Sequence, residues 1–398
     1  MADVKQSSRQ LRLPIFWLYT GHSHSFDAEA VVDGKIVTVA LVLLGCVFAY
    51  SSSIWQCLAL AAIVLIANAP NNKAMRASFA FYAAASLPTV QIVYSFTENH
   101  VHAIASYALL VTANGVLVGI AAKQNGYRWL TIPFALIVLS IPPIGNLNPV
   151  SLAPLAGWIF PGQKTVGLLL LVILLSLMLM PGKRVMLSNA AIGVLVLISM
   201  NANATAVSEK ESSVRGISLS RKLIDTPYQA MFQSAYRYQE LELIENSKAQ
   251  TAVLPESTLA EWSRLDGDIY ANTSRNVYVG ARRFIDDTVY INVVINGKTG
   301  KVVYEQRTPP PVASPTEFVA VSGRGVIRNA GINFLICFEL ASTPRSVGAF
   351  INNDNPVVWI SNLAWFNGDY LEKRMESVLV AWARLYGNNI EKAVMRHA

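Results

Sequence analysis

The first half of the chain consists of long apolar runs separated by short polar segments. Several runs approach the roughly 20 residues that a helix needs to cross the hydrocarbon core of a bilayer. The pattern predicts an α-helical membrane domain of about seven spans over residues 1–202. The spans are expected at 36–50, 54–70, 77–96, 102–122, 129–145, 165–181 and 186–202.

Beyond the polar, Ser-rich stretch 203–214, which reads as a linker, short apolar strands alternate with helical patterns. This alternation predicts an α/β domain over residues 215–398, in which polar residues just past the strand ends are candidates for a site. Helical spacing occurs at 227–246 and 370–387. Strands are expected at 216–219, 251–254, 277–281, 289–295, 301–304, 332–336 and 357–361.

The net charge of +7 is unevenly distributed along the chain. Residues 1–202 hold eleven Lys and Arg against five acids, whereas residues 203–398 hold twenty-one against twenty. With seven spans, nearly all basic residues of the first half fall on one side of the membrane. The positive-inside rule then predicts a cytoplasmic N-terminus and a periplasmic C-terminal domain, in a bacterial inner membrane. The nearly neutral second half has no basic patch, so no nucleic acid contact is expected.

Cys337 is the candidate for reactive chemistry, because Cys46 and Cys57 lie within apolar runs. A cysteine nucleophile needs a base, yet the second half contains only His397, next to the chain end. The base should therefore be a carboxylate, and neither a His-based metal site nor a cofactor is expected. Glu256 follows one predicted strand, and Glu339 lies two residues beyond Cys337, where another ends.

Together, these two strand-end motifs resemble the carbon–nitrogen hydrolase (nitrilase) superfamily, which uses a Glu–Lys–Cys triad. Residues 360–366 are similar to the Ile-Ser-Asn-Asp-Ala-Trp-Phe segment of apolipoprotein N-acyltransferase, and the whole chain resembles the conjugal-transfer TraB proteins of Ti-type plasmids. The resemblance implies an α-β-β-α sandwich with Glu256 as general base and Cys337 as the nucleophile that forms a thioester. It also implies a positioning role for Glu339 and a substrate pocket lined by Asn362, Trp365 and Phe366.

The sequence departs from this family pattern in four places. Gln306 stands where the triad lysine is expected, and the neighbouring Arg307 is the cation left to offer charge to an oxyanion. A Pro-rich stretch replaces the segment that carries a further acid, and Leu363 replaces an Asp. The chain stops at Ala398, where the family continues into another strand, so the sheet is expected to be incomplete or differently closed.

Two functions from different classes follow from these features. The first is an enzyme of plasmid transfer that performs acyl transfer or amide-bond chemistry on an extracytoplasmic substrate, for which a lipid-linked molecule is a candidate. The alternative is a catalytically impaired binding or scaffold component of the mating apparatus. Expected partners are membrane lipids and a lipoprotein or mating-apparatus protein. A transporter is disfavoured, because the predicted spans hold almost no ionisable residues.

Overall fold

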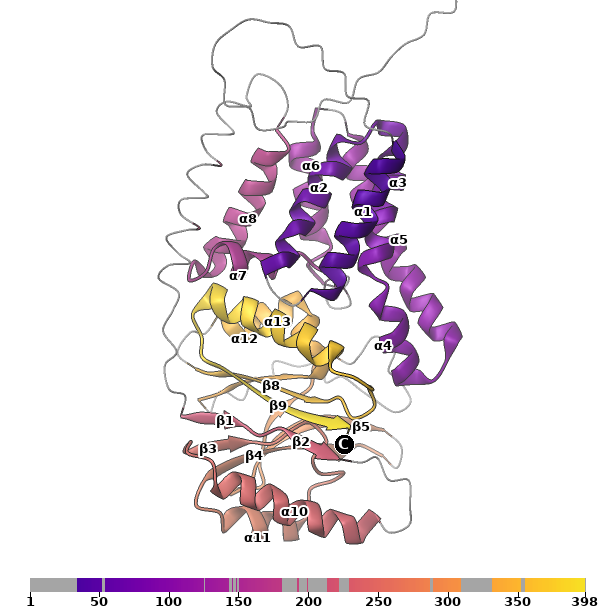
Figure 1. Cartoon of the computed structure of the whole chain (residues 1–398). Coiled ribbons are helices and arrows are strands. Elements are labelled where there is room, and N and C mark those ends of the chain that lie inside the picture. Colours follow the sequence, from indigo (N-terminus) through magenta and orange to yellow (C-terminus); the bar gives the residue numbers. More distant parts are fainter. Residues whose placement is uncertain are drawn as a thin grey trace, which may run out of the picture.

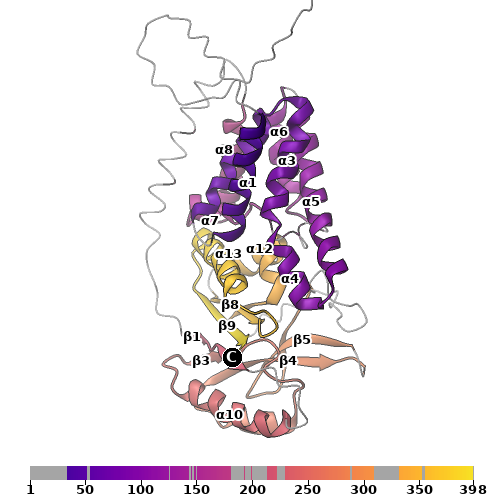
Figure 2. The ribbon, with the colours of Figure 1, turned by 45° about the vertical axis from the view of Figure 1, so that its right-hand side comes forward.

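A computed structural model of the chain describes its two halves as a bundle of helices stacked on an α/β sandwich (Figure 1). The turned view shows the same stacking, with α4 reaching beyond the other helices to the level of α13 (Figure 2). The described residues are 34–51, 54–124, 126–142, 145, 148, 150–180, 192, 199, 213–221, 229–286, 289–308, 331–351 and 355–397.

Six of the seven expected apolar runs contain helices. Apart from Ile192 and Ser199, the seventh run, 186–202, lies outside the described residues, and so does most of the predicted linker 203–214. The helical elements are α1 (Gly34–Tyr50), η1 (Ile54–Leu58), α2 (Ala59–Asn68), α3 (Asn71–Ala85), α4 (Pro88–Thr97), α5 (His100–Lys123), α6 (Arg128–Val138), α7 (Leu155–Ile159) and α8 (Lys164–Met178).

The expected count of seven spans is not reached in the described residues. Among the helices that the structure describes, only α5 is long and apolar enough to cross a membrane. The pair α3 and α4, bent by 47°, would add a second span if it crosses as one. The other apolar helices are shorter, and in some runs the helix ends before the run does. Run 129–145, for example, is helical only as far as Val138. Hydropathy reports how apolar a segment is, but it does not report where its helix stops.

The second half forms two sheets packed face to face. The first has the order β1-β3-β4-β5-β6, and the second, whose strands are all parallel, has the order β2-β9-β8-β7. The strands are β1 (Val214–Gly216), β2 (Leu219–Arg221), β3 (Thr251–Val253), β4 (Asn276–Phe284), β5 (Tyr290–Asn296), β6 (Val302–Glu305), β7 (Asn333–Ile336), β8 (Val357–Asn362) and β9 (Ile390–His397).

Helices cover both outer faces of the paired sheets, as expected for a nitrilase-like α-β-β-α sandwich (Figure 1). α10 (Gln229–Glu245) and α11 (Arg264–Ala271) cover the first sheet. α12 (Thr343–Phe350) and α13 (Tyr370–Tyr386) cover the second and face the helical half. Between the sheets, side chains such as Val253, Val294, Ile336, Val358 and Ile360 form a continuous apolar core. Removing these side chains from water is the main source of the sandwich's stability.

The structure corrects two expectations about strands. The strand expected at 216–219 is two short strands, β1 and β2, which belong to different sheets. The sequence pattern predicted no strand after the helix at 370–387, but β9 forms there and lies between β2 and β8. The sequence of β9 does not look like a strand because charged residues interrupt it and leave only a short apolar stretch. Two of them, Lys392 and Arg396, form ion pairs with acidic residues of α13.

The helical half and the sandwich share one hydrophobic core, in which Leu155 and Ala156 of α7 are fully buried with Trp382 and Leu385 of α13. The contact is close enough that a Cβ at Gly157 would clash with the carbonyl of Ala381. Shared apolar burial of this kind fixes the two halves relative to each other. A site on the side of the sandwich that faces the helices is therefore bounded by both halves.

Candidate active site

Cys337 lies at the end of β7, at the first residue of the short helix η5 (Cys337–Ala341). Its φ of 51° falls in the left-handed region, and so does that of Ser257 (53°), which follows Glu256. Residues other than glycine rarely adopt this conformation, and it is concentrated at functional sites. The two strand-end corners singled out in the sequence are thus both tight turns.

The fold brings Glu256 and Cys337 together, near enough for the carboxyl group and the thiol each to shift the pKa of the other. Glu256 is only 6% exposed. Its Oε1 accepts a hydrogen bond from Nδ2 of Asn292 at 2.6 Å, and its Oε2 accepts one from the backbone N–H of Asn362 at 2.9 Å. Bonds from strands of both sheets therefore fix the carboxylate beside the sulfur.

The surroundings of this pair favour its protonated forms. Burial raises the pKa of Glu256 to about 7, although the Asn362 N–H opposes the rise. Burial, followed by the charge of Glu256, raises the pKa of Cys337 well above its usual value, against the effects of Ser361 and the Phe338 N–H. At neutral pH the thiol therefore keeps its proton, and a partly ionised carboxylate lies next to it to accept that proton.

Gln306, which stands at the lysine position of the resemblance, is completely buried beside this pair. Its Oε1 accepts a hydrogen bond from Nδ2 of Asn292 at 2.9 Å, the nitrogen that also binds Glu256. Its Nε2 donates to the carbonyls of Thr308 and Ile336 at 3.2 and 3.3 Å. Gln306 thus links the base to the strand that carries Cys337, but its amide hydrogens are committed to carbonyls.

Glu339 is fully buried and accepts four hydrogen bonds. Its Oε2 binds the Tyr304 hydroxyl at 2.8 Å and the Ile336 N–H at 2.9 Å. Its Oε1 binds the N–H groups of Arg307 at 2.7 Å and Thr308 at 3.3 Å. This carboxyl group joins the turn at Cys337 to the end of β6, and its role in positioning the base stays a prediction.

Arg307 is not brought to the thiol. Its guanidinium lies over the Tyr304 ring, 5.6 Å from the centroid. Within the described part of the chain, no hydrogen bond or ion pair joins it to Glu256 or Cys337, and its Nε and Nη2 are buried without a hydrogen-bond partner. Arg307, which the sequence suggested as a substitute for the lysine charge, therefore does not point toward the thiol.

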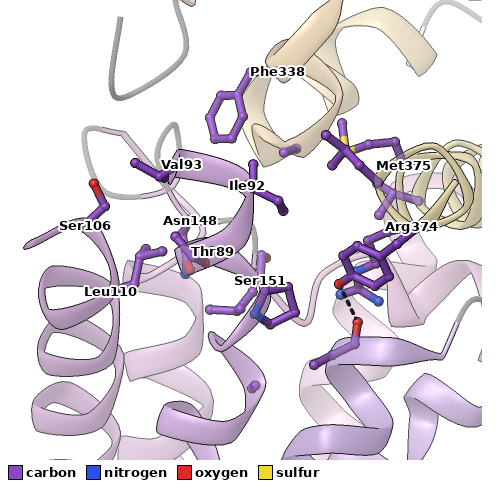
Figure 3. Close-up of a pocket in the computed structure, with 18 of the residues that line it drawn as sticks. Thr89, Ile92, Val93, Ser106, Leu110, Asn148, Ser151, Phe338, Arg374 and Met375 are labelled. Atoms are coloured by element: carbon purple, nitrogen blue, oxygen red, sulfur yellow. Dashed lines mark hydrogen bonds between the residues drawn. The ribbon is translucent and has the colours of Figure 1, made fainter. Parts of the chain in front are cut away.

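A cavity of about 420 Å³ opens beside Cys337, between the helical half and the sandwich (Figure 3). Its walls come from α1, α4, α5 and the segment around Ser151 on one side, and from η5, the end of β8 and α13 on the other. Most lining side chains are apolar. Leu363, which stands where the family has an Asp, is one of them.

The three residues expected to line the pocket have different positions. Trp365 lines the cavity, where its ring packs edge-on against Phe96 of α4 with centroids 5.1 Å apart. Asn362 binds Glu256 through its backbone, while its side chain accepts a hydrogen bond from the Ala364 N–H at 3.1 Å. Phe366 is 3% exposed and belongs to the hydrophobic core. Its expected pocket role is therefore not seen, because it faces inward.

Comparisons with known proteins find similarities at low sequence identity. No protein-family model matches it. It is 24% identical over 380 residues to a probable conjugal transfer protein TraB from Sinorhizobium fredii, covering 88% of this chain and 95% of the relative. Among solved structures it is similar to an amidase from Nesterenkonia sp. AN1, with 11% identity and a TM-score of 0.33 over 46% of this chain and 74% of the amidase. It is also similar to a carbon–nitrogen hydrolase from Helicobacter pylori G27, with 10% identity and a TM-score of 0.31 over 46% and 72% of the two chains.

Proposed function

We propose that this chain is a membrane-bound, nitrilase-like protein of plasmid conjugal transfer that forms a thioester at Cys337 with the acyl group of an apolar substrate. The placement of the buried Glu256 carboxylate beside the Cys337 thiol, at the edge of a mostly apolar cavity, carries the proposal. The link to conjugation rests on the similarity to the TraB protein. The substrate class rests on the cavity lining, because apolar walls favour an acyl chain over a small polar amide.

In the first step, Glu256 takes the proton of the Cys337 thiol as the sulfur attacks the carbonyl carbon of an ester or amide. The carbon–sulfur bond forms, and the carbonyl electrons move onto the oxygen. The Phe338 N–H, which favours the ionised form of the Cys337 sulfur, is a candidate donor for that oxygen. When the oxyanion collapses, the bond to the leaving alcohol or amine breaks and Glu256 returns the proton to it, leaving a thioester.

In the second step, Glu256 removes a proton from the acceptor amine or water, which attacks the thioester carbonyl. Collapse of this intermediate breaks the carbon–sulfur bond, and the sulfur regains the proton from Glu256. The product is an amide or a free acid, and the enzyme returns to its starting state. One carboxyl group with a pKa near 7 can serve both steps at neutral pH.

Membrane attachment is supported by the outer surface of the helical half. Large apolar side chains that would be costly in water are exposed on several helices. They include Ile36, Val39 and Leu43 of α1, Val101, Ile104 and Leu109 of α5, Leu130 and Phe134 of α6, and Val166 and Leu169 of α8. With the basic residues of the first half on the cytoplasmic side, the sandwich and its cavity would lie at the periplasmic face of the inner membrane.

A second candidate function is a binding or scaffold component of the mating apparatus with impaired chemistry. Gln306 favours it, because an amide whose hydrogens bind two carbonyls does not replace the lysine of a Glu–Lys–Cys triad. Loss of one oxyanion donor typically lowers a rate by a factor on the order of 10²–10³, which leaves room for slow chemistry.

The two functions are separated by an acylation experiment on the full-length protein. The protein is incubated with a phospholipid or a p-nitrophenyl ester, and peptides are searched by mass spectrometry for an acyl adduct. The adduct is expected on Cys337, to persist in Cys57→Ala and to disappear in Cys337→Ala. The enzyme proposal fails if no adduct forms and Cys337→Ala supports mating at the normal frequency.

A further inference from the structure

Arg374 of α13 is the one charged side chain among the described residues that line the cavity beside Cys337. Its Nη1 donates to the carbonyls of Phe48 at 3.1 Å and Ser51 at 3.5 Å, and its guanidinium lies 4.8 Å from the centroid of the Phe48 ring. Within the described residues it forms no ion pair, although the neighbouring Glu372 and Lys373 both do.

The Arg374 side chain is partly buried, and burial lowers its pKa, yet an arginine keeps its charge in a protein. A partly buried cation without a counter-charge is costly. The carbonyls at the end of α1 offset part of that cost, as basic groups do at helix C-termini. They engage one nitrogen, and Nε and Nη2 donate to none of the described residues. The guanidinium thus keeps donors for an anion.

We propose that Arg374 binds the anionic oxygen group, a carboxylate or a phosphate, of an amphiphile whose apolar chain occupies the Cys337 cavity. The planar fork of an arginine fits either group, and both are its usual partners. Figure 3 shows Arg374 at one side of the cavity and Phe338, the neighbour of Cys337, at another, with the apolar Ile92 also on the wall. This inference adds to the proposed function a selection for negatively charged substrates. It rests on that function, which identifies the cavity as the substrate site.

Binding can be measured without turnover, which separates this inference from the proposed chemistry. Full-length Cys337→Ser protein in non-ionic detergent micelles is titrated calorimetrically with dodecyl phosphate, laurate and uncharged dodecanol. At least one anion is expected to bind about tenfold or more tightly than the alcohol, because a charge-assisted hydrogen bond replaces an uncompensated cation. The anion with the larger advantage identifies the group, phosphate or carboxylate, that the site selects.

Arg374→Gln should remove the advantage of the anion and leave dodecanol binding unchanged, and Arg374→Lys should keep part of it. The matched control is Arg384→Gln on the same helix, since Arg384 lies over Trp158 and does not line the cavity. This control should bind all three probes as the parent does. Equal weakening of dodecanol and the anions by Arg374→Gln would mean that Arg374 only joins α13 to α1, and would overturn the inference.

The parent protein also tests the inference without any change at Arg374. If dodecanol binds as tightly as both anions, there is no anion site, whether or not the variants fold. If the anion preference is present but no acyl adduct forms on Cys337, the chemistry under "Proposed function" fails while the binding site stands.

Discussion

Restoring a lysine at position 306 should convert a slow site into a faster one and shift its pH dependence. Oε1 of Gln306 and Oε1 of Glu256 accept from the same Asn292 nitrogen at 2.9 and 2.6 Å, which puts the two oxygens within about 5.5 Å of each other. A lysine in this space would bring its ammonium close to Glu256. If one of the carbonyls that now bind the Gln306 amide, those of Thr308 and Ile336, accepts from the ammonium, hydrogens remain for Glu256 and for an oxyanion.

Two magnitudes follow from this geometry. An opposite charge within about 4–6 Å lowers the pKa of a carboxyl group by roughly 1–3 units. The acidic limb of the rate profile, expected near pH 7 from the pKa of Glu256, should therefore move to about pH 4–6 in Gln306→Lys. An added oxyanion donor should also raise the rate of Cys337 acylation by a factor on the order of 10²–10³.

The assay is p-nitrophenol release from an acyl ester between pH 4 and 9, with the adduct on Cys337 confirmed by mass spectrometry. Gln306→Met is the matched control, because it removes the amide without adding charge and should be no faster than the parent. If Gln306→Lys folds but the acidic limb of its pH–rate profile stays near pH 7, the ammonium does not act on Glu256. The proposed link between position 306 and Glu256 would then be wrong.

Three further predictions concern the framework of the site. Glu339→Gln places an amide N–H₂ against backbone N–H donors and should lower the free energy of unfolding by roughly 1–3 kcal/mol, measured by denaturant unfolding. An unchanged midpoint would refute the role of this carboxyl group in joining the turn at Cys337 to the end of β6. Gly157→Ala places a Cβ against the Ala381 carbonyl and should cost about 1–3 kcal/mol, seen as a lower melting temperature; wild-type stability would contradict the close contact between the halves. Trp365→Ala opens the cavity beside Phe96 and should broaden the range of acyl chains that label Cys337; an unchanged chain preference would show that Trp365 does not bound the substrate.

Local patterns were sufficient to predict the strand before Cys337 and the helix at 370–387. Apolar runs of strand length and an amphipathic helix are each encoded by neighbouring residues. The pairing of Glu256 with Cys337 came instead from the family resemblance, and the structure places the two side chains near each other.

Other parts of the site depend on contacts between distant segments and could not be predicted. Asn292 lies in an apolar strand, and its amide reaches Glu256 because of where β5 lies in the sheet. The one sign in the sequence that Asn292 belongs to the site was its polar side chain between the apolar Ile291 and Val293. Arg374 sits on an amphipathic helix, where a basic residue normally faces water. The packing of α13 against α1 directs it instead into a cavity that neither half forms alone.

The acylation of Cys337 as a function of pH, compared between the parent and Glu256→Gln, tests most directly whether a carboxylate activates this thiol. In the parent, acylation should increase as pH rises through about 7, because the ionised form of Glu256 accepts the thiol proton. In Glu256→Gln it should fall by a factor on the order of 10²–10⁴, the usual contribution of a general base. Acylation of Glu256→Gln at the parental rate would contradict the account.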